Sequence, residues 1–278
     1  MKRQVIILLL NALVCSSLSA QSVKVMTFNI RYDNPGDGVN CWDERKNDVA
    51  DLVLDHDPDL LGVQEALLHQ MEYLREELTG FTSIGVGRQD GRVKGEFSAI
   101  FYDSTRFTVL KQETFWLSAN GDTASVGWDA ALERICTYGL FMDRATGDSI
   151  YVFNTHFDHR GEIARERSAE LILDRILTLP DRDIPVILMG DLNTKPDERP
   201  VRILAEYLID AAAAVAAGRS GPEGTWCTFD PEFDPVDRID YIFTRNFQDI
   251  LEVEHVRTRT TDGLNISDHL PVLTELKF

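Results

Sequence analysis

Carboxylate, amide and imidazole side chains stand at the ends of apolar segments, where a buried strand would otherwise carry hydrophobic residues. Asp191 and Asn193 follow the apolar segment 185–189, and their spacing of two residues aims both side chains to the same side of an extended chain. Burying both groups without a ligand would cost several kcal/mol. The pair therefore predicts a polar site at the end of this strand.

A second segment of this kind carries a histidine. Asn154, His156 and Asp158 alternate with Thr155 and Phe157, so an extended backbone places the three polar side chains on one face. A lone histidine in such a segment is more often structural than catalytic. The segment indicates a site only in combination with others.

Further polar residues close apolar segments elsewhere, namely Asn29, Glu65, Glu96, Asp240, Asp268 and His269. Taken alone, Glu65 could simply begin a helix, and Asp240 could pair with Arg238 two positions earlier. Their ordered combination predicts a cluster of carboxylates and imidazoles suited to acid–base or metal chemistry.

The elements that must position these residues follow from hydrophobic periodicity. Apolar stripes with helical spacing surround Val49, Leu74 and Ile172, and several predicted strands are apolar on both faces. Strands buried between helices favour two packed sheets with helices outside over one doubly wound sheet. The predicted strands are 23–30, 59–64, 97–102, 149–157, 185–190, 239–244 and 272–278.

In order along the chain, these motifs resemble those of the endonuclease/exonuclease/phosphatase superfamily. The residues that carry the resemblance are Asn29, Gln64-Glu65, His156, Asp191-x-Asn193, Asp240 and Asp268-His269. The resemblance implies an α+β fold of the deoxyribonuclease I type, a four-layer αββα sandwich of two mixed β-sheets flanked by helices. It covers a single catalytic domain, residues 21–278.

Within the superfamily, Asn154-Thr155-His156 and the following His159 are most similar to the nocturnin-like and sphingomyelinase-like branches. Apurinic endonucleases carry Asn at the position of His156, which makes abasic DNA a poor candidate substrate. Segments 116–118, 127–130 and 159–162 resemble an exported bacterial subgroup. Shared fold does not fix the substrate.

The resemblance also implies roles for these residues. Mg²⁺, or alternatively Mn²⁺, would be bound by Glu65 and Asn29, with Asp268 contributing. Asp191 would be the general base for the attacking water, or would contact the metal directly, and Asn193 would hold the phosphate or the nucleophile. The non-bridging oxygens would be bound by two histidines, each oriented by a carboxylate: His156 by Glu96 and His269 by Asp240.

Residues for substrate specificity are less clearly marked. Arg134, His159, Arg160 and Arg165 are candidate substrate contacts. The four tryptophans, Trp42, Trp116, Trp128 and Trp226, could stack on a ring, although a tryptophan more often belongs to a core.

Residues 1–20 have the pattern of a secretory signal peptide: Lys2 and Arg3, an apolar run too short to span a bilayer, and small residues up to Ala20. The mature protein is therefore expected in the periplasm or outside the cell, without a membrane anchor. Cys15 raises a lipoprotein as a minor alternative, but Val14 stands where a lipid-attachment site normally carries a small residue.

The formal net charge is −18, which becomes −20 once Lys2 and Arg3 are removed. Such a surface repels polyanions and disfavours long duplex DNA as a substrate. The expected partner is a small or single-stranded phosphoester, and the expected state is a monomer.

These observations predict a metal-dependent hydrolase of phosphoester bonds, whether phosphodiesterase, nuclease or phosphatase, that uses in-line attack of water. An exported glycoside hydrolase would also need paired carboxylates and aromatic surfaces. It would not explain Asp191-x-Asn193 together with Asp268-His269. A non-catalytic binding module on the same fold would be expected to have lost a site residue, and none is visibly lost.

Overall fold

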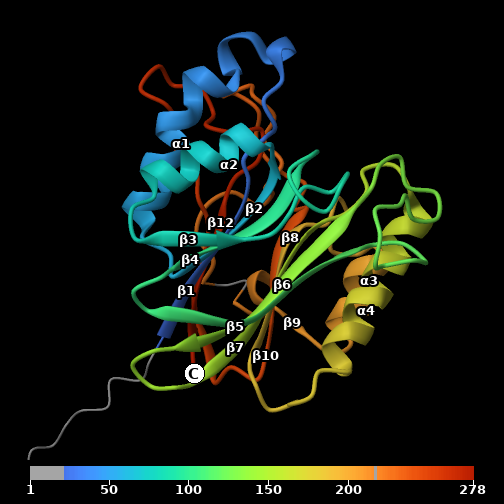
Figure 1. Cartoon of the computed structure of the whole chain (residues 1–278). Coiled ribbons are helices and arrows are strands. Elements are labelled where there is room, and N and C mark those ends of the chain that lie inside the picture. Colours follow the sequence, from blue (N-terminus) through green and yellow to red (C-terminus); the bar gives the residue numbers. More distant parts are fainter. Residues whose placement is uncertain (1–21, 216–217) are drawn as a thin grey trace, which may run out of the picture.

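A computed structural model describes residues 22–215 and 218–278. The predicted signal peptide lies outside the described residues. Two six-stranded sheets form the centre of the structure, and helices cover their outer faces (Figure 1). No helix within the described ranges is long and apolar enough to cross a membrane.

The first sheet contains both parallel and antiparallel pairs. Its central strand β1 (Ser22–Asn29) pairs in parallel with β2 (Leu60–Ala66) and antiparallel with β12 (Val272–Lys277). The strand order is β11 (Asp249–His255), β12, β1, β2, β4 (Phe97–Asp103) and β3 (Phe81–Ile84).

The second sheet is also mixed. Its central strands β7 (Ser149–His156) and β8 (Val186–Asp191) are parallel, and β10 (Asp240–Arg245) runs antiparallel to β8. The strand order is β5 (Phe107–Trp116), β6 (Ile135–Asp143), β7, β8, β10 and β9 (Ile209–Asp210).

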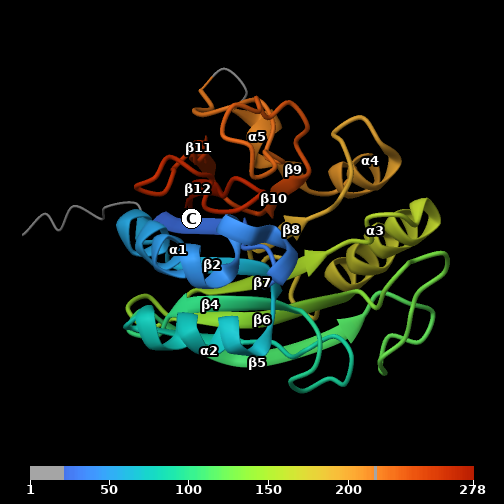
Figure 2. The ribbon, with the colours of Figure 1, turned by 90° about the horizontal axis from the view of Figure 1, so that it is seen from above.

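Helices α1 (Trp42–His56) and α2 (Leu68–Glu77) cover the first sheet, and α3 (Glu162–Leu177) and α4 (Arg199–Ala205) cover the second (Figure 2). The short helices η1 (Pro35–Asn40) and α5 (Ala211–Ala214) lie in connections. Three apolar cores separate the four layers, one beneath each helical layer and one between the sheets. The predicted αββα sandwich is confirmed.

The central strands are buried on both faces, as their apolar sequences predict. In β8, Ile187 and Met189 belong to the core between the sheets, whereas Val186 and Leu188 pack under α3 and α4. This alternation follows from the period of two residues in a strand.

A buried amide joins the two sheets. Asn154 on β7 donates from Nδ2 to the carbonyls of Val63 (2.9 Å) and Ala99 (2.7 Å), and its Oδ1 accepts from Gln64 Nε2 (2.7 Å). A Cβ at Gly62 would lie 2.9 Å from this amide, so glycine is needed for the close approach. Asn154 therefore fixes the position of one sheet against the other.

We expect His255 to make the fold sensitive to acid. It is fully buried, its Nδ1 donates to the Pro222 carbonyl (2.9 Å), and burial lowers its pKa from 6.5 to about 4. The unfolded chain then binds a proton between those pH values that the folded chain does not. Stability should be lost as the pH falls through this window, by up to about 3 kcal/mol.

Urea unfolding of the wild type and of His255→Gln between pH 7 and pH 4 measures this contribution. The variant should lose less stability over the window, because Gln does not titrate. His69→Gln serves as the control, since the His69 side chain is 52% exposed. An equal loss in wild type and His255→Gln would show that other groups cause the acid sensitivity.

Candidate active site

Three neighbouring strands of the second sheet deliver polar side chains to one end of the sheet. The register pairs His156, the last residue of β7, with Asp191, the last residue of β8. It also pairs Asp191 with Asp240, the first residue of β10. Because β7 and β8 are parallel and β10 is antiparallel, the ends of the first two meet the start of the third.

The first sheet delivers Asn29 from the end of β1 and Glu65 from β2. The pairing of β2 with β4 is irregular between Val63 and Ala66, and Glu65 has a left-handed backbone with φ of 64°. A bulge of this kind redirects a side chain. Glu65 Oε1 accepts from Asn29 Nδ2 (3.1 Å), and Glu65 Oε2 accepts from the backbone N–H of Tyr32 (3.1 Å).

Asn29 links the two sheets across the site. Its Nδ2 donates to Asp191 Oδ2 (2.9 Å) as well as to Glu65, and its Oδ1 accepts from the backbone N–H of Arg31 (3.0 Å). Its carbonyl accepts from Ser267 Oγ (2.7 Å), which ties down the segment before β12 that carries Asp268 and His269. The sequence-predicted residues from both sheets are thus brought together.

His269 is paired with a buried carboxylate. Its Nδ1 donates to Asp240 Oδ2 at 2.9 Å, and its Nε2 lies 3.8 Å from Asp191 Oδ2. Burial alone would lower the pKa of His269, but the carboxylates of Asp240 and Asp191 outweigh it and raise this pKa well above its usual value. At neutral pH His269 is an imidazolium whose Nε2–H is available to an anion.

His156 is neutral. Burial and the positive charges of Arg134 and Arg88 hold its pKa well below the usual value. Its Nε2 lies 3.0 Å from Asn193 Nδ2, which also donates to the Phe157 carbonyl (3.1 Å). The nitrogen facing Asn193 therefore accepts, and the proton of His156 resides on Nδ1.

Asp191 lies between the two histidines. Burial raises its pKa to about 7, although the charge of His269 opposes this. Its Oδ1 accepts from the backbone N–H of Asn193 (2.9 Å), and its Oδ2 lies 3.4 Å from His156 Nε2. A carboxylate with a pKa near neutrality is suited to accept a proton from water.

Two groups of residues could hold a cation. Burial and the charge of Glu65 raise the pKa of Asp268, so these carboxylates repel each other across the site, and a hard divalent cation would relieve that repulsion. Ligand atoms of Asp191, Asp240 and His269 also lie within 4.8 Å of one another. We favour Glu65 and Asp268, because a protonated His269 is a poor metal ligand. Asn29 fits less well, since its oxygen already accepts from Arg31.

The expected pairing of Glu96 with His156 is not seen. Glu96 Oε2 lies 4.0 Å from His156 Nδ1, which is too far for a hydrogen bond. Both Glu96 oxygens instead accept from the Arg88 guanidinium at 2.7 Å. This two-point ion pair is the more favourable arrangement for a carboxylate, and no local sequence pattern predicts it.

A cavity of about 430 Å³ opens over the cluster. Of the predicted substrate contacts, Arg134 and His159 line it, and Arg134 Nη2 lies 3.0 Å from His159 Nδ1. Arg160 and Arg165 are not among its walls, contrary to the prediction. Arg165 lies on α3 and donates to the Asp158 carbonyl (3.0 Å). The walls that the sequence did not identify as site residues are Arg31, Tyr32 and Leu132. Of the four tryptophans considered as ring contacts, Trp226 lines this cavity.

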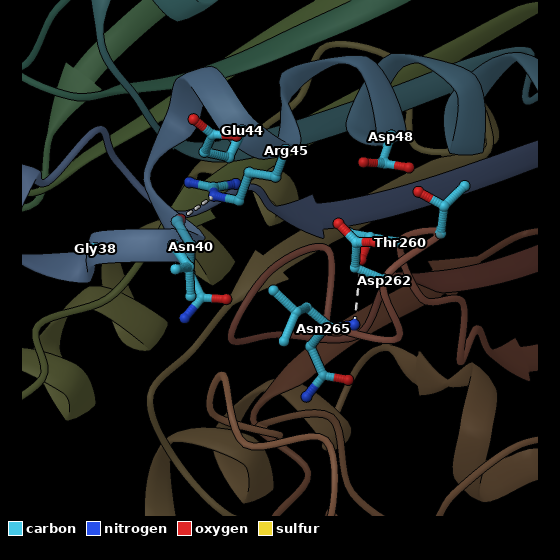
Figure 3. A pocket seen from close by; sticks show the side chains of 11 residues that line it. Gly38, Asn40, Glu44, Arg45, Asp48, Thr260, Asp262 and Asn265 are labelled. Atoms are coloured by element: carbon cyan, nitrogen blue, oxygen red, sulfur yellow. Dashed lines mark hydrogen bonds between the residues drawn. The ribbon is translucent and has the colours of Figure 1, made fainter.

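A second cavity, of about 570 Å³, lies between η1, α1 and the segment 260–265 (Figure 3). Arg45 forms one wall, and its guanidinium donates to the backbone carbonyls of Asn40, Ile30 and Arg31. Although this cavity is the larger one, it contains none of the clustered acid–base residues. The chemistry of the side chains, not cavity size, identifies the active site.

Comparison with solved structures identifies relatives in Bacteroides thetaiotaomicron. An endonuclease/exonuclease/phosphatase family protein is 35% identical, with a TM-score of 0.86 over 93% of this chain and 98% of that chain. A mannosyl-6-phosphatase is also 35% identical, with a TM-score of 0.86 over 92% of this chain and all of that chain.

Human nocturnin is 23% identical over 295 residues, which cover 92% of this chain and 65% of nocturnin. This chain spans about half to two thirds of the length of the curated relatives it matches. The model of the Endonuclease/Exonuclease/phosphatase family matches residues 26–269, a range that includes every clustered residue of the site from Asn29 to His269. The chain therefore belongs to the endonuclease/exonuclease/phosphatase family.

Proposed function

We propose that this protein is a metal-dependent phosphoester hydrolase that removes phosphate from a small phosphorylated sugar. The observation that carries the proposal is the buried carboxylate of Asp191, whose Oδ2 lies 3.4 Å from His156 Nε2 and 3.8 Å from His269 Nε2. Burial raises its pKa, while His156 stays neutral and His269 is charged. The 35% identity to a mannosyl-6-phosphatase supports a sugar phosphate as the substrate.

Each clustered residue has a separate role in the proposed reaction. Asp191 accepts the proton of the attacking water, and Asn193 helps to hold that water in line with phosphorus. His269 donates from Nε2 to a non-bridging oxygen, while Asp240 keeps it protonated and oriented. His156 is neutral, and the proton on its Nδ1 makes it a second donor beside the charged His269.

Glu65 and Asp268 are the residues that would hold Mg²⁺ or Mn²⁺. Oxygen ligands of this kind suit these ions. When bound, the metal would neutralise charge on the phosphoryl oxygens. The left-handed backbone of Glu65 and its two hydrogen bonds hold the carboxylate in a single orientation for that role.

We further propose that the protein acts outside the cytoplasm and does not act on long duplex DNA. The pattern of residues 1–20 and the formal charge of −18 support this proposal. N-terminal sequencing of the protein from the periplasm or the medium should give a start at Gln21. An unprocessed or lipid-modified N-terminus would contradict it.

A substrate panel tests the proposed activity. The purified protein is assayed with Mg²⁺, Mn²⁺ or EDTA against mannose 6-phosphate, bis-p-nitrophenyl phosphate, short RNA and p-nitrophenyl mannoside. We expect metal-dependent release of phosphate, fastest from the monoester. Turnover that persists in EDTA would contradict the role of the metal, and cleavage of the mannoside alone would favour a glycoside hydrolase.

A further inference from the structure

Trp226 presents an aromatic surface to the active-site cavity. It is 38% exposed and lines the cavity with the catalytic residues, whereas Trp42 and Trp116 are buried. Most other walls are charged or polar, and only Leu132 and Tyr32 add further apolar surface. An exposed indole in such a cavity is suited to contact an apolar face of a ligand.

The backbone around Trp226 is bonded to the catalytic segments. Trp226 forms a β-bridge with His269, and the Cys227 N–H donates to the Asp268 carbonyl (2.9 Å). The Thr225 hydroxyl accepts from the backbone N–H of Asp240 (3.1 Å). These bonds fix the indole relative to the residues that act on the phosphate.

The indole is also held from the side. Its ring packs edge-on against Phe233, with 5.7 Å between ring centroids and an interplanar angle of 70°. Within the described residues its Nε1–H has no hydrogen-bond partner, so it can donate to a ligand hydroxyl. The ring is thus oriented by the protein while one face and one donor remain available.

Polar groups of the cavity complement this surface. Arg134 is 4% exposed, its Nε donates to Asp158 (3.3 Å) and its Nη2 contacts His159, yet its buried Nη1 has no partner among the described residues. A buried donor without a partner is costly unless a ligand accepts from it. Aromatic and donor groups together match a ring that has a C–H face and hydroxyl groups.

We propose that Trp226 is the specificity-determining residue of this site and stacks on the pyranose ring of the leaving alcohol. This inference rests on the proposed phosphatase function and narrows its substrate class to phosphorylated ring sugars. Stacking on an aromatic side chain should strengthen binding about tenfold. The effect should fall mainly on KM, because the ring lies away from the phosphorus atom.

The test compares mannose 6-phosphate with its open-chain relative, mannitol 1-phosphate. We expect the wild type to have a KM about tenfold lower for the ring sugar, and Trp226→Ala to abolish that preference. Inorganic phosphate, which has no leaving group, should inhibit both proteins with the same Ki. Trp226→Phe, which keeps an aromatic face, should retain most of the preference.

Trp128→Ala is the matched control, since Trp128 is 40% exposed but does not line the cavity. It should leave the ring preference intact. Turnover with an unchanged preference in Trp226→Ala would overturn this inference alone. A larger effect of Trp226→Ala on a mononucleotide than on mannose 6-phosphate would assign the indole to a nucleobase instead. Absence of turnover in the wild type would overturn the proposed function and this inference with it.

Discussion

Asp191→Asn should lower kcat for phosphate release by about a thousandfold or more, the effect of removing a well-placed general base. Asp191 is buried, and its oxygens are held by Asn29 and by the backbone N–H of Asn193. Asn has the same shape but cannot accept a proton from water. Steady-state kinetics with Mg²⁺ at saturating substrate measure the loss.

The same variant should fold normally. Burial opposes the charged form of Asp191 and raises its pKa to about 7, so an uncharged amide removes an electrostatic cost. The amide can keep only one of the two accepted hydrogen bonds, so we expect the metal-free protein to lose no more than about 1 kcal/mol of stability. Thermal unfolding in EDTA provides this control. If Asp191→Asn folds and retains kcat within tenfold of the wild type, Asp191 is not the base.

His269→Gln should lower kcat by about a hundredfold or more, because it removes a charged donor to the phosphoryl oxygens. Asp240→Asn tests the pairing of His269 with Asp240 through the pH dependence of kcat. The Asp240 carboxylate raises the pKa of His269, so without it the imidazolium should lose its proton at lower pH. The alkaline limb of the kcat profile should therefore move towards acid in Asp240→Asn.

His56→Gln is the control for these changes, since His56 lies at the end of α1 and bonds to the Leu52 carbonyl. It should leave kcat and its pH profile unchanged. An alkaline limb that stays in place in Asp240→Asn would show that His269 titration does not control the rate.

The layers of the fold could be predicted because strands that are buried on both faces have mostly apolar sequences. The central strands β1, β2, β7, β8 and β10 are buried on both faces and are apolar over most of their length, a pattern typical of a sheet between two other layers. Strands β3, β5, β6, β9 and β11 were not predicted. Strands β3, β5 and β11 have exposed positions, and in β5 the polar residues Lys111, Gln112 and Glu113 interrupt the apolar pattern. Strand β9 has only two residues, and Thr137 and Gly139 interrupt the apolar pattern of β6.

The core of the site could be predicted for a related reason. Polar residues at the ends of buried strands have few structural uses, and the register of parallel strands brings such ends together. Asn154 shows the limit of this argument. It shares a face with His156 in sequence, yet it joins the two sheets instead of entering the site.

The loops around the site could not be predicted from local pattern. Arg88, which lies in a turn, forms an ion pair with Glu96. Trp226 lines the cavity because its segment pairs with Asp268 and His269, about forty residues later in the chain. Backbone strain left no sequence signal either. Glu65 and Asn193 have left-handed conformations, at φ of 64° and 47°, without being glycine. Such strain often marks functional positions.

Hydrolysis in H₂¹⁸O tests the central claim most directly. Methyl mannoside 6-phosphate is incubated with the protein and Mg²⁺, and both products are analysed by mass spectrometry. If Asp191 activates water for attack at phosphorus, each released phosphate carries a single labelled oxygen and the methyl mannoside carries none. Label in the sugar hydroxyl, or no phosphate release with metal present, would contradict the account.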